Sequence, residues 1–308
     1  LPTWNPYVGC GEPGLGNGQM YPFSPFLWPF YLAPTPWSFT LGLMLGCLWG
    51  AAGAYFWLGR FPLAAWQRAF WACLIVINPT TVRVMVYSNV WAAWWFGWLL
   101  WSWDRTARRG GRCWWLPALF VAGMVYSGHP ETALLLSAVS LLYGIAVRYL
   151  LPREERTEAF WLKALGISGL AGLLSGVNWM PVLGRWGEAL SYKSLLPELA
   201  TRGRYGFVDL VNPRSDIYMG VALACLVALG MASARDRRLW PSVGLLAVAV
   251  VLLFHPIPLD GFNYLLTAGG LIPNLYSREL FWYALVPLAA VGAGLLGDEM
   301  VLGRRLVF

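Results

Sequence analysis

Apolar residues in this chain form nine long runs separated by shorter polar segments. The runs are Trp37–Leu58, Pro62–Pro79, Met85–Trp103, Cys113–Gly128, Thr132–Leu151, Phe160–Pro181, Ile217–Ala234, Trp240–Ile257 and Glu279–Gly297. Several contain about 18 or more residues with almost no charge, which is the length needed to cross a bilayer. Because backbone groups inside a bilayer must bond within their own segment, each run is expected to be a helix. The pattern predicts an all-α bundle of about nine transmembrane helices.

The composition supports the same class of protein. Hydrophobic residues make up 58% of the 308 positions and charged residues only 12%, whereas soluble domains carry roughly 25% charged residues. The five cysteines show no CxxC or Cys/His spacing, so neither a disulfide framework nor a zinc site is expected. The sequence is therefore that of a polytopic membrane protein.

The distribution of Lys and Arg predicts the orientation. If residues 1–36 lie outside, fifteen of the 22 basic residues fall on the inner side and seven on the outer side. Cytoplasmic loops of membrane proteins carry such an excess, which places the C-terminus in the cytoplasm. The net charge of +7 then has a topological explanation, and no nucleic-acid partner is expected.

Residues 1–36 differ in composition from the rest of the chain. They contain eight prolines and eight aromatic residues, a density that predicts an irregular loop on the outer membrane surface rather than a helix or strand. We treat 1–36 as an extracytoplasmic loop and 37–308 as one transmembrane domain. The chain starts at Leu1 without a signal peptide, which is typical of a fragment that lacks its first segment, so this first outer loop is expected to be incomplete.

The stretch "GHPE" places His129 and Glu131 between two apolar runs, on the predicted outer side. One interpretation is a Pro-containing turn with Glu131 near a helix N-terminus, where the dipole favours a carboxylate. That interpretation does not explain the histidine. The alternative is a metal or phosphate ligand, or a proton-transfer pair, because ionisable side chains near hydrocarbon are candidates for function.

Three more polar residues lie at predicted outer ends of spans. Arg278 precedes the last run, either as a side chain that reaches back to the interface or as an anion clamp. Asn89 and Asn178 are amides of the kind that more often bond between helices than bind a ligand. The chain shows no Ser–His–Asp order, no HExxH and no paired-carboxylate spacing.

Four stretches together resemble one family. "LPTWNPYVGCGEPGLGNGQMYPFSP" resembles the "WNPxxxxGxPxxxNxQxxxYP" loop of YfhO-like bacterial membrane proteins, of the GT-C glycosyltransferase class. "GHPETALL" is similar to the "GHPQ" turn of that family, and "NWMPVLGRWGEALSYKSL" to its "LPxxxxxxxSxR" segment. "YSRELFWYALVPLAAVGAGLL" is similar to its late arginine-plus-helix segment. The four matches occur in family order and span nearly the whole chain.

The resemblance implies a GT-C-like helix bundle in the bacterial cytoplasmic membrane. Such proteins transfer a sugar from a polyprenyl-phosphate carrier to an extracytoplasmic acceptor, a polymer or lipid of the cell envelope. Carried over to this sequence, the residues lining the site would be Trp4, Asn5, Glu12, Pro13, Asn17, Gln19 and Tyr21. His129 and Arg278 would lie near the carrier phosphate or a divalent metal, Mg²⁺ or Mn²⁺, with His129 as the metal ligand.

The catalytic carboxylate is the main departure from the family. In this class it lies just after the first span, upstream of Leu1, so either it is absent here or Glu12 replaces it. Glu131 is a second candidate base. Two other classes stay open: a transporter or lipid flippase, which requires polar groups near mid-bilayer and broken helices, and a non-catalytic fragment. The concentration of polar groups at outer ends argues against transport.

Overall fold

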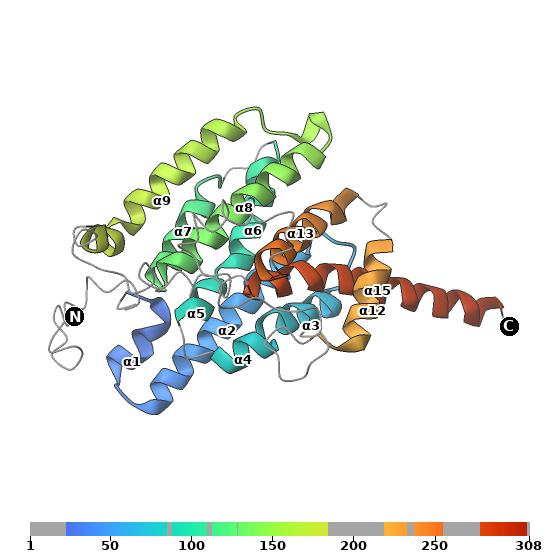
Figure 1. Ribbon diagram of the computed structural model, residues 1–308, viewed down its shortest axis with the longest axis horizontal. Coiled ribbons are helices and arrows are strands. Elements are labelled where there is room, and N and C mark those ends of the chain that lie inside the picture. Colours follow the sequence, from blue (N-terminus) through green and yellow to red (C-terminus); the bar gives the residue numbers. More distant parts are fainter. Residues whose placement is uncertain are drawn as a thin grey trace.

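The computed structural model describes residues 23–84, 88–109, 113–127, 129–183, 219–232, 237–254 and 278–306. These residues form helices (Figure 1), and no strand occurs among them apart from an isolated bridge between Arg108 and Arg156. Within these ranges, three helices are long and apolar enough to cross a membrane: α2 (Pro36–Leu58), α8 (Pro130–Leu150) and α9 (Phe160–Leu183). The prediction of an all-helical membrane protein is confirmed at this level.

Each of the nine predicted runs contains helix. The remaining helices of the runs are α3 (Ala65–Val76), α4 (Pro79–Val84), α5 (Ser88–Ala93), α6 (Phe96–Ala107), α7 (Leu116–Tyr126), α12 (Gly220–Ala232), α13 (Trp240–Phe254) and α15 (Arg278–Leu306). Shorter apolar stretches occur in α7 (Leu116–Tyr126), α13 (Trp240–Phe254) and, among the described residues, within α12 (Ala222–Ala232) and α15 (Leu280–Leu295). Nine spans and the GT-C arrangement stay predictions.

The second predicted run ends as a helix at Val76 because Asn78 starts a new one. The Asn78 side-chain oxygen accepts a hydrogen bond from the Thr81 backbone N–H at 2.9 Å. This contact caps the N-terminus of α4, and Pro79 occupies the first helical position, where its missing N–H costs nothing. Helix α4 therefore covers residues 79–84, between the second and third predicted runs, where hydropathy predicts no span.

Residues 25–32 correct the prediction that the N-terminal loop contains no helix. A 3₁₀ turn, η2 (Pro25–Leu27), leads directly into the short helix α1 (Trp28–Leu32). Pro25 and Pro29 stand in the first turns of these elements, where proline is tolerated. Phe26 packs edge-on against Trp94, with ring centroids 5.3 Å apart, so this turn is anchored in the core.

Small residues bring α2 and α6 close together. Gly46 and Gly50 of α2 face the Trp94 side chain, and Gly97 of α6 faces the backbone of Gly53 and Ala54. A stripe of glycines lets two helix backbones approach closely, which is how membrane helices commonly associate. The Trp98 indole N–H then reaches the Trp49 carbonyl at 2.9 Å and joins the same two helices.

Helix α6 lies at the centre of the bundle. It packs against α2, α7 and α8, while α9 lies along α7 and α15 packs against α12 and α13 (Figure 1). One stripe of α8 faces the interior: Thr132, Leu135, Leu136, Val139, Ser140, Tyr143 and Val147 are buried. Its spacing of three and four residues is that of a helix with a single interior face.

The bundle has two ends, which we name after one residue each. The His129 end contains the start of α8 and the end of α7, and the Arg60 end contains the ends of α2, α6 and α8. Large aromatic residues stand exposed toward both: Trp28 and Trp37 near the first, and Tyr149, Trp161 and Trp240 near the second. Such aromatic belts are typical of the two interfaces of a membrane.

Candidate functional site

His129 occupies an unusual backbone position at the start of α8. Its φ of 64° and ψ of 73° are left-handed, and it is the one non-glycine residue with positive φ among the described residues. The residue is 7% exposed, and its Nδ1 lies 2.9 Å from the Thr132 hydroxyl. Backbone strain of this kind persists where the surroundings impose it, often at functional sites.

The strain at position 129 can be measured separately from the loss of the ring. We expect His129→Gly to be more stable than His129→Ala by about 1–2 kcal/mol, because only glycine adopts a left-handed conformation without steric cost. Thermal unfolding of both variants in detergent tests this difference. Equal stabilities would mean that position 129 is not strained in the protein.

Hydrogen bonds tie the neighbouring helices together at the His129 end. The Trp95 indole N–H donates to the Ser127 hydroxyl at 2.8 Å. The Asn178 amide of α9 donates to the Val125 carbonyl of α7 at 2.9 Å, and the Tyr126 hydroxyl donates to the Leu174 carbonyl. Asn178 thus makes the interhelical bond typical of membrane amides, and its role as a substrate ligand stays a prediction.

The two predicted charged residues each begin a helix. Glu131 stands in the first turn of α8, half-buried, where the helix dipole favours a carboxylate. Arg278 begins α15 and is only 4% exposed. The side chain of Arg278 is therefore enclosed by protein, and it does not lie open at a surface as an interface arginine would.

Arg278 stands on a different helix from His129. Helix α15 packs against α3 and α4, where the Trp282 indole N–H lies 3.2 Å from the Thr80 hydroxyl. His129 starts α8, which packs against α6 and α7. The structure therefore joins His129, Glu131 and Asn178 at one end, with Arg278 on a separate helix.

The other predicted site residues lie outside the described structure. Asn89 belongs to α5, but its side chain is not among those described. The N-terminal set is likewise outside the described residues: Trp4, Asn5, Glu12, Pro13, Asn17, Gln19 and Tyr21. Among the described residues, no three His, Cys, Asp or Glu side chains gather in a metal-binding group.

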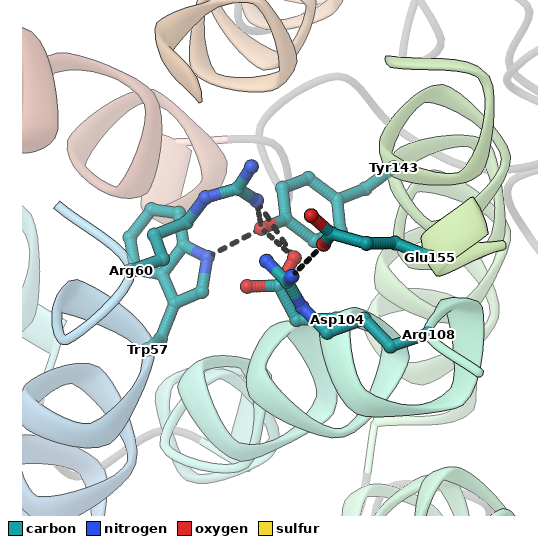
Figure 2. Close-up of polar contacts among 6 residues, drawn as sticks. All are labelled: Trp57, Arg60, Asp104, Arg108, Tyr143 and Glu155. Atoms are coloured by element: carbon teal, nitrogen blue, oxygen red, sulfur yellow. Dashed lines mark hydrogen bonds and ion pairs between the residues drawn. The ribbon is translucent and has the colours of Figure 1, made fainter. Parts of the chain in front are cut away.

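A buried polar network that sequence reasoning missed lies at the Arg60 end (Figure 2). Arg60 pairs with Asp104 at 2.9 Å, and the two side chains are 9% and 10% exposed. The Tyr143 hydroxyl accepts hydrogen bonds from Arg60 and, at 2.9 Å, from the Trp57 indole N–H. Residues from α6, α8 and the end of α2 thus meet at one enclosed ion pair.

Hydrogen bonds and an ion pair hold the segment after α8 next to this network. The Arg109 N–H donates to the Glu155 carbonyl at 2.6 Å, and the Thr157 N–H donates to the Ala107 carbonyl at 3.1 Å. Arg108 and Glu155 form an ion pair at 2.8 Å (Figure 2), about half exposed. Residues 152–157 therefore have a fixed position against the end of α6.

The sequence analysis did not predict this network, because it used only the number of Lys and Arg residues in each loop and did not look for pairs of opposite charge. Arg60 follows one apolar run and Asp104 follows another. An acidic residue at the end of a span, on the side where neighbouring spans end in arginine, is a signal for such a pair. The sequence also holds Tyr143 inside an apolar run, where a hydroxyl needs a partner.

Comparison of this chain with models of protein families, with curated proteins and with solved structures found no match.

Proposed function

We propose that this protein is a GT-C-type glycosyltransferase of the bacterial cytoplasmic membrane. It transfers a sugar from a polyprenyl-phosphate donor to an acceptor in the cell envelope, at its His129 end. The observation that carries the proposal is the geometry of His129, a buried ring on a strained left-handed residue at the start of an apolar helix. Strained backbone conformations of this kind occur most often where the side chain has a function.

The proposed reaction needs one base and a way to stabilise a leaving phosphate. A carboxylate takes the proton of the acceptor hydroxyl, the acceptor oxygen bonds to the anomeric carbon, and the bond from that carbon to the carrier phosphate breaks with inversion. Glu131 is two residues from His129 in the same turn, and Glu12 is the other candidate base. His129 stabilises the negative charge on the departing phosphate, and a contact of Arg278 with the same phosphate stays a prediction.

The charge asymmetry supports an orientation with the His129 end outside. Residues 1–36 then lie outside and the C-terminus lies in the cytoplasm, since the Arg60 end carries the basic residues of the segments 105–109 and 148–163. A divalent cation bound by His129 stays a prediction, and no step of this reaction depends on it.

The flippase alternative gains one observation from the structure, the second polar site around Arg60 and Asp104. Transport across the bundle requires a polar route between the two ends. The interior face of α8, however, is lined mainly by Leu135, Leu136 and Val139 between Thr132 and Tyr143, and the Ser140 hydroxyl on this face is paired with the Trp103 indole N–H. This apolar middle favours a reaction at one end over passage between the ends.

Purified protein should remove labelled hexose from a polyprenyl-phosphate carrier in the presence of envelope lipids. We expect His129→Ala to lower the rate at least tenfold, because stabilisation of the leaving phosphate is lost. Arg153→Gln, an exposed change at the Arg60 end, serves as the control and should retain the wild-type rate. Equal rates for both variants would remove His129 from the site, and no transfer by wild type from several hexose donors would contradict the proposal.

A further inference from the structure

A cavity of about 610 Å³ opens at the Arg60 end, away from the proposed reaction site. It lies between the ends of α2, α6 and α8 and the start of α13. In the described part of the chain, its charged lining consists of Arg60, Arg108, Glu155, Arg156 and Arg238. The volume is in the range of small-molecule sites, which are about 300–1,000 Å³.

The lining carries an excess of positive charge. Four arginines face one carboxylate, Glu155, and even with Asp104 behind Arg60 the sum of four positive and two negative charges is +2. Arg156 is held in place because its guanidinium donates to the carbonyls of Leu151 and Tyr149 at 2.7 and 2.6 Å. Fixed guanidinium groups of this kind match the oxygens of a phosphate.

The remaining lining is apolar and aromatic. Val147, Leu150 and Leu151 complete one wall, and Trp240 and Tyr149 border the opening with 51% and 59% of their surfaces exposed. Exposed Trp and Tyr beside apolar helices are typical of headgroup depth in a membrane. The cavity therefore combines a positively charged region with an apolar wall, and an amphipathic anion matches both.

We propose that this cavity binds a phosphate-bearing anion, supplied by the headgroup of an acidic phospholipid in the adjacent leaflet. The basic lining recognises the phosphodiester, and the apolar wall accepts the first part of the acyl chains. Free inorganic phosphate offers the same recognition chemistry without the chains. This second site does not depend on the proposed sugar transfer at the opposite end.

Calorimetric titration of the purified protein in a neutral maltoside detergent tests the proposal with three probes. These are dioctanoyl phosphatidylglycerol, dioctanoyl phosphatidylcholine and inorganic phosphate. We expect phosphatidylglycerol to bind at least tenfold more tightly than phosphatidylcholine, because only its headgroup has a net negative charge. Equal binding of the two lipids would overturn the proposal, and tight binding of inorganic phosphate alone would replace the lipid with a soluble anion.

The double variant Arg108→Gln/Arg238→Gln locates the binding. It removes two of the lining arginines, and we expect the dissociation constant for phosphatidylglycerol to rise roughly tenfold or more, the effect of losing charge-assisted hydrogen bonds. The matched control Arg105→Gln/Arg153→Gln removes the same charge from exposed positions outside the lining. Equal losses in both variants would mean that binding is a general surface effect, which contradicts the site.

A test on the wild-type protein does not depend on whether the variants fold. Exposed ionic contacts weaken as salt rises, whereas enclosed ones are screened much less. Because Arg108 and Arg238 are exposed, we expect phosphatidylglycerol binding to weaken several-fold between 0.1 and 0.5 M NaCl, while phosphatidylcholine binding stays within about twofold. The same salt response for both lipids would contradict recognition of the phosphate charge by the arginines.

Discussion

Replacement of Asp104 by alanine is expected to destabilise the protein by about 3–5 kcal/mol, the typical cost of removing one partner of a buried ion pair. The reason is the position of Arg60, whose side chain is only 9% exposed and pairs with Asp104 at 2.9 Å. Without the carboxylate, the guanidinium charge stays enclosed without its counter-charge. The penalty is the desolvation of Arg60 and not the strength of the original contact.

Two further variants separate this cause from a general loss of packing. Asp104→Asn keeps the size and a hydrogen-bond acceptor for Arg60 but removes the charge, so we expect a smaller loss than in Asp104→Ala. The double variant Arg60→Met/Asp104→Leu removes both charges and should recover most of the stability, since apolar replacements of buried pairs are often neutral or better. Thermal unfolding in detergent compares all three with wild type.

The neighbouring pair of Arg108 and Glu155 provides the control. It has a similar distance, 2.8 Å, but the side chains are 46% and 51% exposed. Exposed pairs contribute about 0–1 kcal/mol, so Glu155→Ala should change stability by no more than that. If Glu155→Ala and Asp104→Ala cost the same, burial does not determine the energy of the Asp104 contact.

The helical fold was predictable because hydropathy alone marks a segment that must satisfy its backbone inside a bilayer. The predicted run Trp37–Leu58 differs from α2 by one residue at its start, and Thr132–Leu151 is close to α8. A short helix between two runs was not predictable from hydropathy. Asn78 caps α4, which covers residues 79–84 between two apolar runs, and a side-chain cap does not appear in the average hydropathy of a segment.

The site was predictable only in part, for a related reason. A histidine and a carboxylate between two apolar runs indicated a candidate site at the start of α8. The structure adds that the backbone of His129 has a left-handed conformation. The surrounding packing imposes this conformation on a residue type that rarely adopts it, so the sequence alone does not show it. The Arg60–Asp104–Tyr143 contacts join residues up to 83 positions apart, and a pattern along the chain does not pair such distant residues.

Replacement of Gly97 by alanine is expected to destabilise the protein by about 2 kcal/mol, within the usual range for overpacking. A Cβ atom at this position would lie 2.5 Å from the Ala54 nitrogen and 2.7 Å from the Gly53 carbonyl carbon. Both atoms belong to the α2 backbone and have no rotamer that avoids the clash. The helices must separate, which also strains the hydrogen bond from Trp98 to the Trp49 carbonyl.

Gly169→Ala in α9 is the matched control, because nothing lies within 4 Å of a Cβ atom built there. Alanine is about 1 kcal/mol more favourable than glycine inside a helix, so this variant should be as stable as wild type or more stable. The same substitution is therefore expected to change stability with opposite signs at the two positions. A stabilising effect at both positions, measured by thermal unfolding, would show that α2 and α6 do not meet at Gly97, and the close approach that places Arg60 beside Asp104 would lose its basis.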